Sequence, residues 1–305
     1  MLEVKNLSKS FDNAQALDEV SFKVLPGEVF ALLGPNGAGK TTAMRLLMHI
    51  LKPDEGEILY KNEPRAKLRR NLFGYLPEER GLYQRAKILD LLVYFGMLNR
   101  LSHHRAEIEA IRYLDKLGLV DYTQKRVSEL SKGMQQKIQF ILSMLHDPDI
   151  LILDEPFAGL DPVNQMVLRD IVYENKKEDK IIILSTHQMS EVEIMADRIL
   201  LLNQGRNILE GTLEEIKSRF KENAFYIESE NNIAAIRDIK DIKIIEEHNQ
   251  SCKFAIIGKE ITKDKILQTI FQKIPVKKFI ELEPSLNEIF IKLVQNPYTK
   301  SSKKA

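Results

Sequence analysis

Three glycines, one lysine and two threonines lie within nine consecutive residues near the N-terminus. Their spacing fits the pattern G-x-x-x-x-G-K-[ST], in which loop N–H groups and the lysine bind phosphate oxygens. The glycines permit a tight turn that aims the backbone N–H groups inward. We expect Lys40 to reach the β- and γ-phosphates of a nucleotide and the Thr41 hydroxyl to ligate Mg²⁺. The candidate nucleotide-binding residues of this stretch are Gly34, Pro35, Asn36, Gly37, Ala38, Gly39, Lys40, Thr41 and Thr42.

The segments on both sides of this loop have the patterns that position such a site. Residues 29–33 form a continuous apolar run, as a strand buried on both faces requires. Residues 41–51 have helical spacing and stop before Pro53. The start of that helix adds a partial positive charge near the phosphates. Strand, loop and helix together favour a phosphate site over an ordinary glycine-rich turn.

Two adjacent carboxylates, Asp154 and Glu155, come at the end of an apolar strand pattern over 150–155. Open α/β sheets place their chemistry at the carboxyl ends of strands, and two buried acids are costly without cations or a reaction to serve. A second apolar run, 180–187, ends in His187. A lone histidine at a strand end is usually structural. Because we expect these two strands to be parallel neighbours, a functional His187 is favoured here.

Residue patterns outside these motifs predict an α/β domain over 1–220. Alternation with a period of two over residues 1–25 predicts half-buried antiparallel strands. Alternating strand and helix patterns then predict a parallel, doubly wound sheet. A helical region is expected at about 85–148, with two apolar stripes that should pack against neighbours. One stripe consists of Ile88, Leu91, Leu92, Phe95 and Leu98, and the other of Ile108, Ile111, Leu114 and Leu117.

A different pattern begins after about residue 220. Residues 221–296 predict strands and helices in the order β-α-β-β-α-β, including a helix over 233–239, which is typical of small ferredoxin-like α+β domains. The polar, basic residues 297–305 are expected to form a disordered tail. No glycine loop, metal-spaced cluster or acid pair occurs in the sequence after residue 220. We therefore expect this domain to be regulatory or structural.

Composition narrows the possible classes of protein. A length of 305 residues suggests about two domains. The net charge of +1 gives no reason to expect a nucleic-acid partner. The single cysteine, Cys252, excludes an internal disulfide and fits a reducing compartment. The start of the chain does not have the pattern of a signal peptide, and no apolar run approaches the ~18–20 residues that cross a bilayer. We expect a soluble chain whose membrane role would need a separate membrane protein.

Taken in order, the motifs over 1–220 resemble those of the ATP-binding subunit of an ABC transporter. The glycine stretch is similar to the Walker A loop of that family, and 150–154 with Glu155 is similar to its Walker B strand and catalytic carboxylate. His187 matches the switch histidine. Phe11, which alone would be interpreted as a core residue, falls where the family stacks an aromatic ring on adenine. The resemblance implies a P-loop NTPase cassette with a mixed sheet and a helical subdomain.

Other motifs match this family with substitutions. The segment 130–134 aligns with the Leu-Ser-Gly-Gly-Gln signature and keeps Ser131 and Gly133, but Lys132 and Met134 replace a glycine and the glutamine. Backbone N–H groups and the serine hydroxyl bind phosphate there, so that function should survive. The family's Ser-Ala-Leu-Asp loop is Ala-Gly-Leu-Asp here, and it keeps Asp161. Where the family usually has a glutamine, this chain has Glu78, which can accept from water or approach Mg²⁺ but cannot donate as an amide does.

The resemblance also implies a mechanism. ATP would bind the glycine loop, with Mg²⁺ held by Thr41 and Asp154 and with Glu78 as a further candidate ligand. Glu155 would polarise the attacking water, assisted by His187 and Lys40. Ser131 and Gly133 would complete the site of a second subunit in a homodimer or a paired cassette, and Asp161 is a further candidate nucleotide-binding residue. The loop containing Glu78 would transmit motion to a separate transmembrane permease, which would place this chain at the cytoplasmic face of the cell membrane.

A narrower resemblance is to the subunits of exporters. The segments 75–83 and 283–290 look like those of sodium-extrusion and drug-resistance systems, which carry a small C-terminal domain. The rival hypothesis is a soluble ABC ATPase of translation or DNA repair. Translation members carry two cassettes on one chain, and repair members insert long coiled coils before the signature; neither is present in this sequence. A non-catalytic binding module conflicts with the presence of Glu155 and His187.

Overall fold

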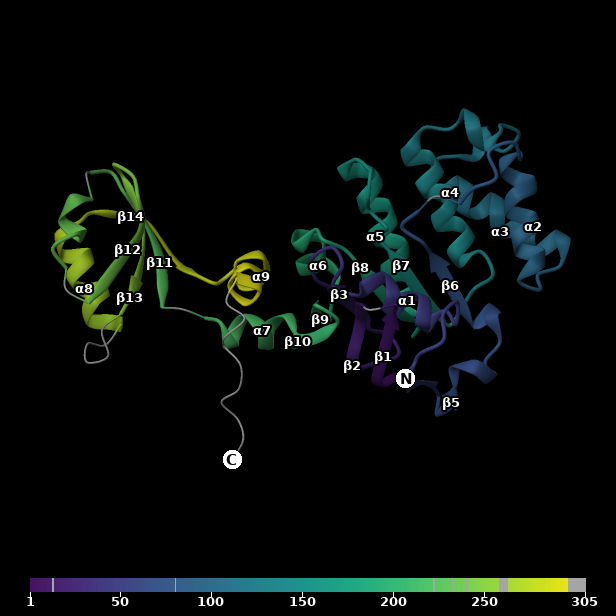
Figure 1. The fold of residues 1–305 in the computed structure, drawn as a ribbon. Coiled ribbons are helices and arrows are strands. Elements are labelled where there is room, and N and C mark those ends of the chain that lie inside the picture. The colour runs from purple at the N-terminus through teal and green to yellow at the C-terminus, as the bar shows by residue number, and fades with distance from the viewer. Residues whose placement is uncertain are drawn as a thin grey trace. The chain divides into compact units, whose positions relative to one another are not determined.

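The chain divides into two compact units, Met1–Leu213 and Glu214–Ala305 (Figure 1). Each unit has a hydrophobic core of its own. The domain boundary expected at residue 220 stays a prediction, and the tail expected at 297–305 lies outside the described residues. The computed structural model describes residues 1–12, 14–79, 81–221, 223–231, 233–239, 241–257 and 263–295.

The first unit is built on a six-stranded sheet with the strand order β10-β9-β3-β8-β7-β6. Neighbours from β9 to β6 are parallel, and β9 and β10 form an antiparallel hairpin, so the sheet is mixed. Every residue of β3, β7 and β8 is buried, which explains their uninterrupted apolar sequences. The strands are β3 (Val29–Leu33), β6 (Phe73–Leu76), β7 (Ile150–Asp154), β8 (Ile181–Ser185), β9 (Arg198–Asn203) and β10 (Arg206–Thr212).

An antiparallel sheet with the order β2-β1-β4-β5 completes the first unit. Its strands are β1 (Leu2–Phe11), β2 (Ala14–Val24), β4 (Glu55–Tyr60) and β5 (Glu63–Pro64). The period-two pattern over residues 1–25 is confirmed, because Leu2, Val4 and Phe22 are buried between more exposed neighbours. These side chains join Phe30 of the mixed sheet and Met44 in one core. That core holds the two sheets together around the strand that leads into the glycine loop.

The helices of the first unit fall into two groups. In Figure 1, α2, α3 and α4 lie together on the side of β6 and form the helical subdomain, whereas α1, α5 and α6 follow strands of the mixed sheet. The helices are α1 (Lys40–Leu47), α2 (Ile88–Leu98), α3 (His103–Lys116), α4 (Lys132–Met144), α5 (Pro162–Lys177) and α6 (Met189–Met195). Short 3₁₀ segments cover Arg65–Lys67, Arg70–Leu72, Val120–Tyr122 and Val127–Glu129.

The apolar stripes expected on α2 and α3 were partly wrong. On α2, Ile88, Leu91 and Leu92 are buried, whereas Leu98 is 59% exposed. The stripe on α3 is also only partly covered. Leu114 and Leu117 are buried, but Ile108 and Ile111 remain 45% and 41% exposed. The buried face of α3 is instead completed by smaller or amphipathic residues, among them Ala106 and Ala110. Helical spacing identifies a possible face, and the neighbouring helices decide which side chains they cover. Across the described part of the chain, no helix has the length and apolar character that crossing a bilayer requires.

The second unit contains a four-stranded antiparallel sheet with the order β12-β13-β11-β14. This strand order is that of the expected ferredoxin-like arrangement. The helix expected at 233–239 is wrong: only a 3₁₀ turn, Ala234–Ile236, forms there. Ile233, Ile236 and Ile239 are all buried, and their spacing of three suits a 3₁₀ turn in a segment too short for a stable helix. The other elements are α7 (Leu213–Arg219), β11 (Ala224–Ser229), β12 (Ile242–Glu247), β13 (Ser251–Ile256), α8 (Lys263–Lys273), β14 (Val276–Leu282) and α9 (Leu286–Gln295).

Candidate nucleotide-binding site

The glycine loop connects the carboxyl end of β3 to the first turn of α1. Gly34, Gly37 and Gly39 all have positive φ angles, of 148°, 78° and 106°. A Cβ on Gly34 would lie 2.3 Å from the carbonyl oxygen of Leu202, and one on Gly39 would lie 2.5 Å from that of Ala16. Both backbone conformation and close packing therefore require glycine at these two positions. At Gly37, where a Cβ would meet nothing within 4 Å, only the φ angle requires it.

Lys40 lies inside this loop. Its Nζ donates hydrogen bonds to the carbonyl oxygens of Gly34, at 2.7 Å, and Pro35, at 3.2 Å. Burial lowers the pKa of Lys40, while the charges of nearby acids, Glu155 first, oppose that lowering. Among the residues that the structure describes, no carboxylate forms an ion pair with this ammonium, so it is suited to pair with an anionic ligand.

Asp154 connects three elements of the first unit. It is the last residue of β7 and only 1% exposed. Its Oδ2 accepts a hydrogen bond from Thr41 Oγ1 of α1 at 3.2 Å, and its Oδ1 accepts one from Ser185 Oγ of β8. A buried carboxylate beside a threonine hydroxyl is a set of hard oxygen atoms, the ligands that Mg²⁺ prefers. The residues present therefore fit a magnesium ion at this point.

Glu155 follows Asp154 at the end of β7 and has a left-handed φ angle of 50°. Its N–H donates to the carbonyl oxygen of Ser185 at 3.0 Å. Its carboxylate accepts from Thr186 Oγ1 at 3.2 Å, and its Oε1 lies 2.8 Å from His187 Nδ1. Because β7 and β8 are parallel neighbours, their carboxyl ends bring the acid and the histidine together, as expected. The Glu155 side chain is 11% exposed and that of His187 65%, so the pair borders solvent.

The remaining candidate residues lie outside this cluster. Ser131 caps α4, accepting from the N–H of Met134 at 3.2 Å, and Gly133 lies in its first turn. Asp161 caps α5 by accepting from the N–H of Asn164 at 3.0 Å, and this bond lowers the pKa of Asp161. A Cβ on Gly133 would lie 3.4 Å from the carbonyl oxygen of Gly159. The signature and the Asp161 loop therefore form one exposed surface.

Two further candidates lie at the surface. Phe11 at the end of β1 is 43% exposed, with Lys9 Nζ 5.6 Å from its ring centroid. This exposure agrees with the expectation that Phe11 is not a core residue. Glu78, just after β6, is exposed, and its charge is among those that raise the pKa of Lys40 against the effect of burial.

Ser185 and Thr186 were not predicted from the sequence as site residues. Both are buried, and each donates a hydroxyl hydrogen bond to one of the two acids. The sequence did contain a feature that could have predicted them: the two hydroxyl residues directly precede His187 at the end of an apolar strand. Parallel pairing with β7 makes that position face the acids.

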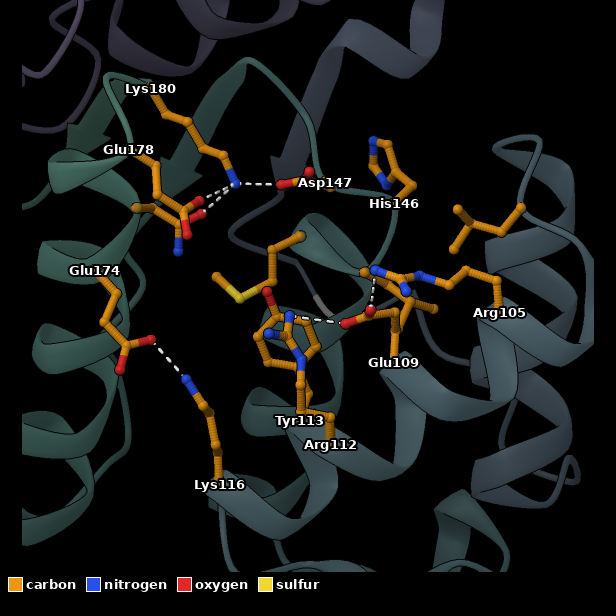
Figure 2. Close-up of a pocket in the computed structure, with 14 residues that line it drawn as sticks. Arg105, Glu109, Arg112, Tyr113, Lys116, His146, Asp147, Glu174, Glu178 and Lys180 are labelled. Atoms are coloured by element: carbon orange, nitrogen blue, oxygen red, sulfur yellow. Dashed lines mark hydrogen bonds and ion pairs between the residues drawn. The ribbon is translucent and has the colours of Figure 1, made fainter.

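A separate cavity of about 390 Å³ lies between α3, the end of α4 and the C-terminal part of α5. Its charged side chains point toward one another in pairs, as Figure 2 shows: Arg105–Glu109, Arg112–Glu109, Lys116–Glu174, Lys180–Asp147 and Lys180–Glu178. Since every lysine and arginine of its lining is paired with a carboxylate, a triphosphate would have to displace these partners. The glycine loop offers backbone N–H groups and Lys40, and a triphosphate would displace no carboxylate partner of Lys40 described there.

Comparison with known proteins agrees with this geometry. The sequence model of the ABC transporter family matches residues 17–158, and one described as "ATP-binding protein DrrA1-3-like, C-terminal domain" matches 211–294. The chain is similar to the ABC transporter ATP-binding protein YhaQ of Bacillus subtilis, with 38% identity over 98% of this chain and 100% of YhaQ. It is also similar to the Nod factor export ATP-binding protein I of Sinorhizobium fredii, with 38% identity over 69% of this chain and 62% of that protein.

A solved structure, "Structure of ATP binding subunit of ABC transporter", has a TM-score of 0.68 and 33% identity over 72% of this chain and 93% of that one. The rival hypothesis of a soluble ATPase of translation or DNA repair has no support in these comparisons. The mixed sheet with its helical subdomain thus has the fold of an ATP-binding cassette. The chain belongs to the ABC transporter ATP-binding proteins and is the ATP-hydrolysing subunit of such a transporter.

Proposed function

We propose that this chain powers a separate transmembrane permease by binding and hydrolysing ATP at the edge of the mixed sheet. The observation that carries the proposal is the convergence of three strand ends with the glycine loop. Thr41 is hydrogen-bonded to Asp154 at 3.2 Å, and Glu155 lies 2.8 Å from His187. Phosphoryl transfer depends on positioning and electrostatic stabilisation, and these contacts place acids, hydroxyls and a lysine around one point.

We assign the triphosphate to residues 34–42 and the adenine ring to Phe11. Lys40 would exchange its contacts with loop carbonyls for the β- and γ-phosphates. Thr41 and Asp154 would hold Mg²⁺, which neutralises charge on the phosphate oxygens when bound. Glu78 is a further candidate ligand of Mg²⁺, since its carboxylate is exposed and its charge acts on Lys40.

Glu155 is our candidate for the group that orients the attacking water. Its carboxylate is held by Thr186 and contacts His187, so its orientation is fixed before the nucleotide binds. His187, which is largely exposed, would contact the γ-phosphate from the solvent side. This division of roles suits a reaction in which the carboxylate accepts the water proton and the imidazole holds the phosphate in line.

We propose that a second cassette covers the surface formed by Ser131, Gly133 and Asp161. Next to Asp161, Val163 is 70% exposed and Met166 is 59% exposed on α5. Exposed apolar side chains grouped beside an exposed polar loop are typical of a contact surface. The partner would be a second copy of this chain or a paired cassette, and its nucleotide would accept contacts from the signature residues.

The permease is proposed to dock on the aromatic surface of α2 that follows the Glu78 loop. Tyr83 and Tyr94 are 63% and 55% exposed and both contact the Phe95 ring, at centroid distances of 6.2 and 5.5 Å. Leu98 nearby on the same helix is 59% exposed. Docking there would hold the chain at the cytoplasmic face of the cell membrane. Nod factor export by the relative named above supports an exporter, and the net charge of +1 gives no reason to propose a nucleic-acid partner.

Co-expression with the permease and purification from detergent-solubilised membranes tests this function. We expect the chain to copurify with its membrane partner and to hydrolyse ATP when Mg²⁺ is present. Tyr94→Glu with Leu98→Glu should release it, while Ile108→Glu, at a similarly exposed apolar position on α3, should not. A wild-type chain that never enters the membrane fraction would contradict the proposed docking. So would a variant with the Tyr94 and Leu98 changes that remains attached to the permease.

A further inference from the structure

A buried glutamine on α4 contacts the loop that contains Glu78. Gln139 is 5% exposed. Its Nε2 donates to the carbonyl oxygen of Glu79 at 3.1 Å and lies 3.4 Å from that of Pro77. The two acceptors belong to the residues on either side of Glu78. One amide group therefore fixes the backbone of this loop on both sides of the exposed carboxylate.

Packing of α4 alone does not explain a glutamine at this position. Its Oε1 is buried and has no hydrogen-bond partner among the described residues. A buried polar atom without a partner is unfavourable, whereas an apolar side chain of the same shape would pack without that loss. The two N–H groups are thus the part of the side chain that the structure uses, and both point to the loop.

The contact between Gln139 and the Glu78 loop lies where β6 and α4 pack closely, which should make it rigid. A Cβ on Gly74 of β6 would lie 1.8 Å from the carbonyl oxygen of Ser143 on α4, so strand and helix pack at close range. One turn before Gln139, Gln136 is also buried and donates to the carbonyl oxygen of Pro156 at 3.3 Å. Residues three apart share a helix face, so this face of α4 contacts both loops that carry candidate acids.

We propose that Gln139 is a positioning residue that holds the Glu78 carboxylate in place at the nucleotide site. This inference rests on the proposed function, in which Glu78 lies near the metal and the phosphates. α4 begins beside Ser131, the residue proposed to contact the nucleotide of the second cassette. The same helix therefore links that contact to the Glu78 loop of its own chain, over about 12 Å of helix at 1.5 Å per residue.

The contact itself can be tested without any assumption about catalysis. The chain has no tryptophan, so Glu79→Trp provides a single fluorescent reporter on an exposed loop residue. Gln139→Met keeps the length of the side chain and removes both donors. We expect this change to lower the fluorescence anisotropy of the reporter and to increase its quenching by acrylamide. Ser143→Ala is the matched control, because it removes a buried hydroxyl of α4 that donates to the carbonyl of Phe140 within its own helix. An unchanged reporter in the methionine variant would overturn the proposal.

A double-mutant cycle on ATP turnover tests the consequence. Gln139→Met should lower turnover roughly tenfold, within the range for coupled neighbours, and should have no further effect when Glu78 is already alanine. Ser143→Ala should leave turnover unchanged in both backgrounds. Equal losses in both backgrounds would show that Gln139 acts otherwise than through Glu78 and would overturn the proposal. Should the methionine variant fail to fold, Gln139→Leu serves the same cycle. A wild-type chain without any Mg²⁺-dependent turnover would instead refute the proposed function, while the reporter would still decide whether the contact exists.

Discussion

Replacing Glu155 by glutamine separates ATP binding from ATP hydrolysis in this account. The amide has the size of the carboxylate, and its oxygen can still accept from Thr186, which now donates to the carboxylate at 3.2 Å. Its nitrogen cannot accept a proton from water. Loss of a positioned base typically costs ~10²–10⁴-fold in rate, which is about 3–5 kcal/mol in activation free energy.

Binding should be nearly unaffected by this change. Lys40 keeps its two contacts to loop carbonyls, and Asp154 keeps its bonds to Thr41 and Ser185. Glu155 is the first of the charges that oppose the burial-induced lowering of the Lys40 pKa, so its removal should lower that pKa further. Lys40 loses its charge as pH rises through its pKa, so ATP affinity in the variant should begin to fall at a lower pH than in the wild-type chain.

The assay is steady-state hydrolysis together with equilibrium binding of fluorescent ATP, in the presence of Mg²⁺. Glu155→Gln should bind ATP within about tenfold of the wild-type affinity, or ~1.4 kcal/mol, and accumulate as an ATP-bound dimer. Glu109→Gln is the control, since it removes another buried acid in the cavity region of α3. Near wild-type turnover in Glu155→Gln would refute the role assigned to this carboxylate.

Three further predictions concern other parts of the chain. Glu78→Gln should change the affinity for ATP with Mg²⁺ by less than about tenfold while altering transport more strongly; a collapse of binding in a titration would make Glu78 an essential ligand. A chain shortened to end near residue 220 should fold and bind ATP but dimerise less without nucleotide; sedimentation with an unchanged monomer–dimer balance would remove a dimer-holding role from the second unit. Burial raises the pKa of Cys252 to about 11, so at pH 8 this 1% exposed thiol is protonated and covered; a disulfide reagent should label it only in denaturant, and rapid labelling of the native chain would contradict its burial.

Much of the fold was predictable because it depends on local patterns. The continuous apolar runs gave the buried strands β3, β7 and β8, and the glycine loop with its flanking segments was recognisable from residue types alone. Parallel pairing then placed His187 beside Glu155, since the ends of neighbouring parallel strands lie at one edge of a sheet.

Features that depend on which neighbour covers a residue were not predictable. Ile108 and Ile111 fit the expected helical stripe on α3 but stay exposed, because no element in the described part of the chain covers that side. Residues 233–239 had a plausible helical pattern, yet the same isoleucine spacing is satisfied by a 3₁₀ turn. The hydrogen bonds of Gln139 join residues about sixty positions apart, and nothing in the local sequence distinguishes this glutamine from a surface residue of a helix.

The central claim is that ATP binds at the glycine loop with its metal between α1 and β7, and one structure would test it directly. We predict that the Glu155→Gln chain, solved with ATP and Mg²⁺, holds the triphosphate within residues 34–42, with the ion bound by Thr41 and Asp154. In a dimer, Ser131 of one copy should contact the nucleotide of the other. A nucleotide found instead in the cavity lined by Lys116 and Lys180, or a metal bound away from Asp154, would contradict the account.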